Sequence, residues 1–172
     1  DLIFPHHEAE ITQMESVSGK KLFVKYWLHT GFLTVKGEKM SKSLGNFVTI
    51  KDFLKEYSAR LLRFFVLKTH YRSPIDYSED IVQQSESELG RLDEFVDRLH
   101  EKSQTSNLKS QANPKLKTFK SDFEKAKEDD LNTPLAVSIL FDLIREGNSL
   151  LNQNKMSKAD AKDILAFLKE TD

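Results

Sequence analysis

A short basic loop carries the residue types most suited to chemistry. Lys39-Met40-Ser41-Lys42-Ser43 places two ammonium groups and two hydroxyls on one segment between Gly37 and Gly45. Ammonium groups can meet phosphate oxygens, and hydroxyls or backbone N–H groups can add hydrogen bonds. Flanking glycines allow such a loop to move and to close over a ligand. The residues therefore indicate a phosphate-binding loop, and a solvated, flexible loop is the alternative.

A histidine and a glutamate near the start of the chain form a second candidate site. In Phe4-Pro5-His6-His7-Glu8-Ala9-Glu10, His6 and Glu10 stand at i and i+4 and would share one face of a helix. An imidazole nitrogen and a carboxylate oxygen at that spacing can both bind zinc. Spacing alone leaves an ordinary surface pair open as the alternative.

Composition limits the class of protein that must position these residues. The 172 residues suffice for one ordinary domain or two small ones, and the 12 phenylalanines indicate a real core. The chain has no cysteine, which excludes disulfides and all-thiolate metal sites and fits a cytosolic protein. No apolar run approaches the length of a membrane span, and no signal peptide is visible. We therefore expect a cytoplasmic protein without a membrane partner.

Charge is distributed unevenly along the chain. Residues 1–77 carry 12 basic and 8 acidic side chains, whereas residues 78–172 carry 14 and 19. A basic first half suits an anionic ligand such as a nucleotide or an RNA backbone. Ordinary scatter of surface charge is the alternative.

Short mixed elements are predicted for the first half. The expected order is a helix from His6 to about Glu15, a short helix around residues 23–27, a strand over residues 31–35 and a turn at Lys36–Gly37. Thr49 then caps a helix through Tyr57, and Ser58 caps another from Ala59 to about Thr69. The last of these is apolar on most sides, so we expect it to be deeply buried.

Helices dominate the second half. Ser78 begins a long helix with an apolar stripe, and the polar residues 103–114 read as a loop. Later helices are expected around residues 119–126, after a cap at Thr133, and after a capping box formed by Ser157 and Asp160. These stripes predict an antiparallel helical bundle whose apolar side chains form a core.

The basic loop resembles the KMSKS signature of the class I aminoacyl-tRNA synthetases. The wider string from Gly31 to Asn46, GFLTVKGEKMSKSLGN, resembles the cysteinyl members in particular. In that family the loop stabilises the pyrophosphate leaving group while the amino acid is adenylated. The resemblance implies that residues 39–43 bind ATP, that Lys39 and Lys42 are the charged catalytic members, and that Lys42 contacts the ATP phosphates.

The string around His6 resembles the family motif Phe-Pro-His-His-Glu-Asn-Glu, with Ala9 in place of Asn. In the family, the first histidine and the last glutamate bind zinc together with two upstream cysteines. The resemblance therefore implies that His6 and Glu10 are zinc ligands and that His7 and Glu8 are not. Zinc would select cysteine, because a soft thiolate binds zinc far better than a serine hydroxyl does.

Three further strings resemble parts of the same family. They are Tyr26-Trp27-Leu28-His29, the segment Thr69–Pro74 and the segment Asp130–Pro134. The segment Thr69–Pro74 corresponds to a region that packs against the inner side of the tRNA, where Arg72 would contact a phosphate or serve as a structural donor. The segment Asp130–Pro134 is expected to cap a helix.

The fold implied is mainly α: the tail of a Rossmann-like α/β catalytic domain that carries the loop, followed by an antiparallel helical bundle. Residues 1–77 would be the C-terminal part of the class I catalytic domain, with the loop and a segment that contacts the tRNA stem. Residues 78–172 would be a bundle of the anticodon-binding type that contacts tRNA and is truncated.

The function implied is ATP-dependent ligation of cysteine to its tRNA through cysteinyl-adenylate. The partners would be tRNA(Cys), cysteine and ATP, and the cofactor would be a Zn²⁺ shared with the upstream cysteines. The family's HIGH motif does not occur in the sequence, so we expect an inactive fragment of the enzyme. Two alternatives stay open: a cysteine ligase of mycothiol synthesis, and a non-catalytic helical module that binds RNA or a protein.

Overall fold

The computed structural model describes residues 2–41, 44–105 and 114–171. The chain divides into two compact units. Unit 1 comprises Asp1–Phe47 and Tyr71–Tyr77, and unit 2 comprises Val48–His70 and Ser78–Asp172. Residues 48–70 pack with the helical unit, so the two compact units are not separated by one cut after residue 77. The functional division into residues 1–77 and 78–172 stays a prediction.

Unit 1 begins with an irregular turn, Ile3–His7, that leads into helix α1, Glu8–Ser18. Gly19, at φ 64°, ends α1 and donates its N–H to the carbonyl of Glu15. The carboxylate of Glu15 then accepts the backbone N–H groups of Leu22 and Phe23, at 2.9 and 3.2 Å.

The prediction of a short helix around residues 23–27 is wrong, because that segment has no helical structure. Phe23 instead donates its N–H to the Glu15 carboxylate, which ties the start of this non-helical segment to the end of α1.

Three short strands form the sheet of unit 1. They are β1, Leu33–Val35; β2, Glu38–Lys39; and β3, Ile75–Tyr77, in the order β2-β1-β3. Strand β1 runs antiparallel to β2 and parallel to β3, with Thr34 opposite Asp76. The expected strand and the turn at Lys36–Gly37 are both present. The sequence predicts a loop directly after Gly37, whereas in the structure Glu38 and Lys39 form a strand that pairs with β1. Strand β3 was not predicted from the sequence.

Unit 2 opens with helix α2, Ile50–Glu56, and helix α3, Ala59–Leu67. The side chains of Thr49 and Ser58 accept backbone N–H groups at the two helix starts, as the sequence predicts. The expectation that α3 is deeply buried is wrong. One face, including Phe64 and Phe65, is buried, whereas Val66 and Leu67 are 43% and 46% exposed. Helix α3 is therefore an amphipathic surface helix of its unit.

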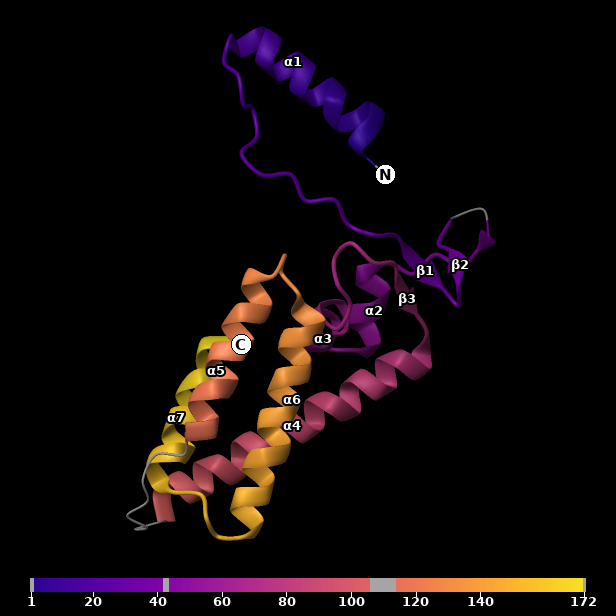
Figure 1. The fold of residues 1–172 in the computed structure, drawn as a ribbon. Helices are drawn as coiled ribbons and strands as arrows, with labels where there is room; N and C mark the ends of the chain where they lie inside the picture. The colour runs from indigo at the N-terminus through magenta and orange to yellow at the C-terminus, as the bar shows by residue number, and fades with distance from the viewer. Residues whose placement is uncertain (1, 42–43, 106–113, 172) are drawn as a thin grey trace. The chain divides into compact units, whose positions relative to one another are not determined.

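Four longer helices complete unit 2. They are α4, Glu79–Thr105; α5, Pro114–Glu128; α6, Thr133–Asn152; and α7, Lys158–Thr171. Helices α5 and α6 pack along each other and α4 packs along α7 (Figure 1). The mainly α fold with an antiparallel bundle is thus confirmed. Of the predicted loop 103–114, residues 103–105 and 114 are helical and residues 106–113 lie outside the described residues.

Side-chain caps set the helix ends of the bundle. Ser157 accepts the N–H of Asp160 at 3.0 Å and donates its hydroxyl to the Asp160 carboxylate at 2.7 Å, so Ser157 caps α7 where the sequence predicts a cap. Helix α6 is capped by Asn132, whose side chain accepts the N–H of Leu135. The cap expected at Thr133 therefore lies one residue earlier.

The core of the bundle is built around aromatic and aliphatic side chains from all four helices. Phe95 and Leu99 of α4 are fully buried beside Leu143 of α6 and Met156. At the rim, the guanidinium of Arg98 donates to the side-chain amide oxygens of residues 148 and 152 of α6. These side chains form one continuous hydrophobic core in unit 2.

Gly147 of α6 lies directly against the ring of Phe95, and a Cβ at this position would overlap that ring. Alanine gains about 1 kcal/mol over glycine in a helix interior, but overpacking a rigid core costs about 1–3 kcal/mol. Because Phe95 is fully buried, its ring can shift only by displacing its core neighbours, so we expect Gly147→Ala to lower the free energy of unfolding by about 1 kcal/mol. Urea unfolding of the chain measures this change.

Gly90 of α4 provides the matched control. It is exposed, and a Cβ there meets nothing within 4 Å. We expect Gly90→Ala to raise the free energy of unfolding by about 0.5–1 kcal/mol, the opposite sign. Equal effects of the two substitutions would show that the contact with Phe95 does not limit this position.

The two units differ in how much apolar surface they bury. Among the described residues of unit 1, no side chain is fully buried, and Phe4, Val17 and Tyr26 are largely exposed. We therefore expect backbone amides of α1 to exchange about 100-fold or more faster than those of α4 and α6. Hydrogen exchange followed by NMR measures this ratio in the intact chain. Uniform protection across both units would contradict the account.

Candidate functional site

The basic loop starts from a tight hairpin between β1 and β2. Its two turn residues, Lys36 and Gly37, have positive φ angles of 53° and 78°. This conformation matches the twist of the paired strands and favours glycine, so Gly37 suits its position and Lys36 is strained. The backbone pairing continues through a hydrogen bond from the N–H of Met40 to the carbonyl of Leu33 at 3.4 Å. The first residues of the loop are therefore held by the sheet.

A carboxylate from β3 holds this turn. Oδ1 of Asp76 accepts the hydroxyl of Thr34 at 2.7 Å and the N–H of Gly37 at 2.8 Å. These bonds, first that of Gly37 and then that of Thr34, lower the pKa of Asp76. Their contribution to stability is present above the ordinary pKa of an aspartate and is lost as the pH falls through the lowered value. No local sequence pattern indicates a role for this residue.

An asparagine closes the other end of the described loop. Oδ1 of Asn46 accepts the N–H of Ser41 at 2.9 Å, and its amide donates to the carbonyl of Lys39 at 3.4 Å. The N–H of Leu44 also donates to the carbonyl of Ser41 at 3.3 Å. Asn46 thus ties the end of the loop back to its beginning. Asn46 is the last residue of the string GFLTVKGEKMSKSLGN, and this position could have indicated its role.

The five predicted ATP-binding residues have different positions. Lys39 is exposed on β2, and its Nζ lies 4.6 Å from the centroid of the Phe32 ring, a cation–π distance. Met40 and Ser41 are half-buried. Lys42 and Ser43 lie outside the described residues. The role of all five in ATP binding stays a prediction.

The predicted zinc ligands lie at the start of unit 1. His6 belongs to the irregular turn and Glu10 to the first turn of α1, so the helix begins later than the sequence predicts. Both side chains are exposed and open to an incoming ligand. In the part of the chain that the structure describes, no three His, Cys, Asp or Glu side chains gather closely enough to hold a metal ion. Their imidazole and carboxylate suit zinc but require further ligands.

His7 makes the contacts that the sequence did not predict. Its Nδ1 lies 2.9 Å from Nε2 of His29, and its ring stacks on Trp27 with the centroids 4.6 Å apart. Trp27 and His29 are two residues apart, so in an extended segment their side chains point to the same side. Because the sequence predicts a helix around residues 23–27, it does not predict that the side chains of Trp27 and His29 lie on one side.

The segment after α3 runs close beside the residues that precede β1. The N–H of Gly31 donates to the carbonyl of Tyr71 at 2.7 Å, and a Cβ on Gly31 would lie 2.7 Å from the nitrogen of Pro74. Only glycine fits this close approach. Arg72 stacks its guanidinium over the Tyr71 ring at 5.2 Å. Whether Arg72 contacts a tRNA phosphate stays a prediction.

The turn between α5 and α6 carries the segment Asp130–Pro134. Asp130 and Leu131 both have positive φ angles, 51° and 56°, which non-glycine residues rarely adopt. The carboxylate of Asp130 lies 3.9 Å from Nε2 of His70. The turn ends at the Asn132 cap of α6, consistent with the expected capping role of this segment.

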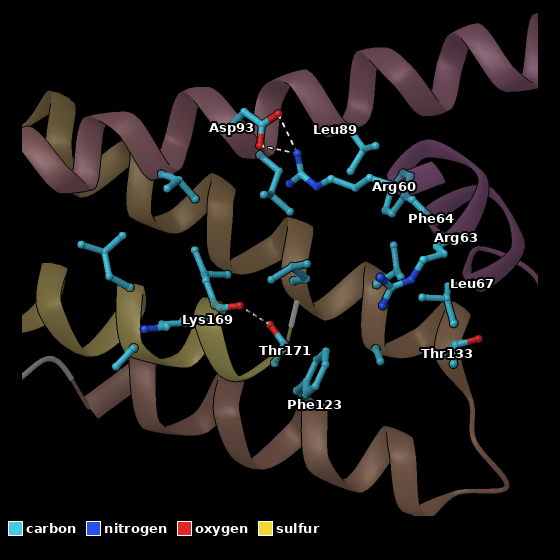
Figure 2. A pocket seen from close by; sticks show the side chains of 18 of the residues that line it. Arg60, Arg63, Phe64, Leu67, Leu89, Asp93, Phe123, Thr133, Lys169 and Thr171 are labelled. Atoms are coloured by element: carbon cyan, nitrogen blue, oxygen red, sulfur yellow. Dashed lines mark hydrogen bonds and ion pairs between the residues drawn. The ribbon is translucent and has the colours of Figure 1, made fainter. Parts of the chain in front are cut away.

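A cavity of about 690 Å³ lies within unit 2, between α3, α4, α5, α6 and α7. Its walls are mostly apolar, and Arg60, Arg63 and Lys169 contribute basic groups (Figure 2). Arg60 meets the carboxylate of Asp93 at 2.8 and 2.9 Å. The cavity contains none of the residues predicted for ATP or zinc binding.

Within residues 2–41, 44–105 and 114–171, no helix is long and apolar enough to cross a membrane.

Comparison with known proteins agrees with this arrangement. Residues 1–87 match the family described as tRNA synthetases class I (C) catalytic domain, and residues 122–171 match the DALR domain. The first match contains the hairpin, the loop and β3, and the second contains α6, α7 and part of α5.

Curated relatives are similar over nearly the whole chain. The cysteine–tRNA ligase of Carboxydothermus hydrogenoformans is 42% identical over 94% of this chain and 35% of its own length. That of Syntrophotalea carbinolica is 46% identical over 92% of the chain and 33% of its own length. That of Caldicellulosiruptor saccharolyticus is 43% identical, with corresponding shares of 98% and 37%. The chain thus spans about a third of the length of these relatives.

The family match covers just over half of the chain and includes the basic loop, its hairpin and the carboxylate that holds the turn. The loop and its hairpin also carry the resemblance read from the sequence. The chain therefore belongs to the class I (C) family of tRNA synthetases.

Proposed function

We propose that this chain is the part of a cysteine–tRNA ligase that presents the loop for ATP and the helices for tRNA. The observation that carries the proposal is the family match over residues 1–87, which contains a basic loop held at both ends by side-chain hydrogen bonds. The complete enzyme would form cysteinyl-adenylate and pyrophosphate from cysteine and ATP. It would then transfer the cysteinyl group to the terminal ribose of its tRNA.

The loop would act through positioning and charge. Negative charge builds on the departing pyrophosphate during adenylation, and preorganised ammonium groups stabilise it there. Lys39 and Lys42 are the charged groups that we assign to this role, with Lys42 at the ATP phosphates. The exposed position of Lys39 on a strand supports this, because its Nζ can leave the Phe32 ring for an anion without disturbing a core.

We also propose that His6 and Glu10 supply two ligands to a zinc ion in the complete enzyme. Their exposure and their donor types fit this metal. Zinc, when bound, would supply selectivity for a thiolate over a hydroxyl. His7 contacts His29 through a ring nitrogen and stacks on Trp27. Within the described residues of this segment, His6 is therefore the imidazole available to bind a metal.

The helical unit would contact tRNA. The match of residues 122–171 to the DALR domain supports this assignment, as do the basic side chains Arg60, Arg63 and Lys169 on one cavity of the unit. Arginine and lysine supply phosphate contacts that do not depend on base sequence.

Cysteine-dependent exchange of pyrophosphate into ATP tests the proposal. The complete polypeptide that contains this chain should catalyse exchange with cysteine and should discriminate against serine. Exchange with transfer of cysteine to an amino sugar, and none to tRNA, would favour the mycothiol-type ligase. Binding of tRNA with no exchange would favour a non-catalytic RNA-binding module.

A further inference from the structure

One carboxylate oxygen in unit 1 receives two donors from different parts of the hairpin. Oδ1 of Asp76, on β3, accepts the hydroxyl of Thr34 on β1 and the N–H of Gly37 in the turn, at 2.7 and 2.8 Å. The register of the parallel pair sets Thr34 directly opposite Asp76. The carboxylate is therefore aligned by the backbone of the sheet.

The hairpin needs an acceptor at this place. Strands β1 and β2 pair over only two residue positions, and a two-stranded hairpin of this size is marginally stable by itself. Both turn residues have positive φ angles, and Lys36 adopts this conformation at a cost that glycine avoids. The bond from Gly37 to Asp76 anchors the turn to a third strand and offsets part of that strain.

This anchor acts on the residues proposed for ATP binding. Lys39 ends β2 two residues after Gly37, and the N–H of Met40 extends the pairing with β1. Asn46 holds Ser41 and Lys39 from the other side. Asp76 and Asn46 thus restrain opposite ends of one segment.

We propose that Asp76 is a positioning residue for the basic loop. Its carboxylate fixes the β1–β2 turn on β3 and so keeps Lys39 and Met40 oriented for an anionic ligand. The effect on loop order depends only on the structure, whereas the effect on catalysis rests on the proposed function. Direct contact of Asp76 with a phosphate is disfavoured, because like charges repel and its Oδ1 is already occupied.

Three variants of the complete enzyme separate the contributions of hydrogen bonding and charge. Asp76→Ala removes the acceptor and the charge. Asp76→Asn removes the charge but keeps an oxygen that can accept from Thr34 and Gly37. Glu38→Gln removes a charge from the exposed neighbouring strand and leaves the anchor intact, so it is the matched control.

Hydrogen exchange measured by mass spectrometry gives the first readout. In Asp76→Ala, peptides covering residues 33–41 should exchange about 10-fold faster, the loss expected for a hydrogen bond to a charged group. Asp76→Asn should stay within about 3-fold of the parent, and Glu38→Gln should match it. Peptides of α4 should be unchanged in all three. Unchanged exchange over residues 33–41 in Asp76→Ala, or equally fast exchange in Glu38→Gln, would overturn the proposal.

Pyrophosphate exchange kinetics give the second readout. Asp76→Ala should lower kcat/KM for ATP by about 10-fold with the KM for cysteine unchanged, and Asp76→Asn should restore most of it. A faster-exchanging loop with unchanged ATP kinetics would overturn the positioning role. A parent enzyme without exchange activity would instead refute the proposed function, and the hydrogen-exchange result would still decide whether Asp76 orders the loop.

Discussion

Replacement of Lys42 by alanine in the complete enzyme is expected to lower kcat for cysteine-dependent pyrophosphate exchange by about 100- to 1000-fold. The ammonium group is assigned to the charge that develops on the bridging oxygen and on the departing pyrophosphate. A donor matched to that charge acts mainly in the transition state, so kcat should fall while the KM for cysteine changes little. Steady-state exchange at varied cysteine and ATP measures both constants.

Lys51→Ala is the control for general loss of positive charge. Lys51 is an exposed lysine of α2, in the other unit, and we assign it no role in catalysis. Its replacement should leave exchange within about 2-fold of the parent, as is usual for surface substitutions. Near-normal exchange in Lys42→Ala, with loss of tRNA affinity alone, would mean that the loop contacts RNA and not ATP.

Replacement of His6 by alanine should act on cysteine and not on ATP. Loss of a residue that only supports a metal ligand typically reduces metal affinity by about 10- to 100-fold. Loss of a ligand itself should reduce zinc affinity by at least as much. We therefore expect His6→Ala to raise the KM for cysteine and to reduce discrimination against serine, since a pocket without metal separates such close analogues poorly. The zinc content of the purified enzyme, measured by atomic emission, provides a readout that is independent of activity.

Glu8→Gln is the matched control for this site. Glu8 is exposed and lies two residues from His6. The family resemblance implies that it is not a zinc ligand. The variant should keep both its zinc and its affinity for cysteine. Retention of zinc and normal cysteine kinetics in His6→Ala would remove this residue from the metal site.

Local chemistry made much of the fold predictable. Thr49, Ser58 and the pair Ser157/Asp160 are side chains that satisfy free N–H groups at helix starts, and each does so where the sequence indicates. The periodic apolar stripes of the second half also predict the helical bundle, because a helix must bury such a stripe. These features depend on neighbours in sequence, which a single chain displays directly.

Features that depend on distant partners were not predictable. Strand β3 is three residues long and exists because it pairs with β1, about 40 residues away. The roles of Asp76 and of His29 follow from contacts with Gly37 and His7, which no local pattern reveals.

Transfer of labelled cysteine to tRNA by the complete polypeptide tests the proposed ligase function. We expect ATP-dependent formation of cysteinyl-tRNA and its loss in Lys42→Ala, with the Lys51→Ala control still active. Formation of cysteinyl-tRNA at the parent rate by Lys42→Ala would contradict this function. Failure of the parent to charge tRNA with cysteine, under conditions where it binds cysteine, ATP and tRNA, would contradict it as well.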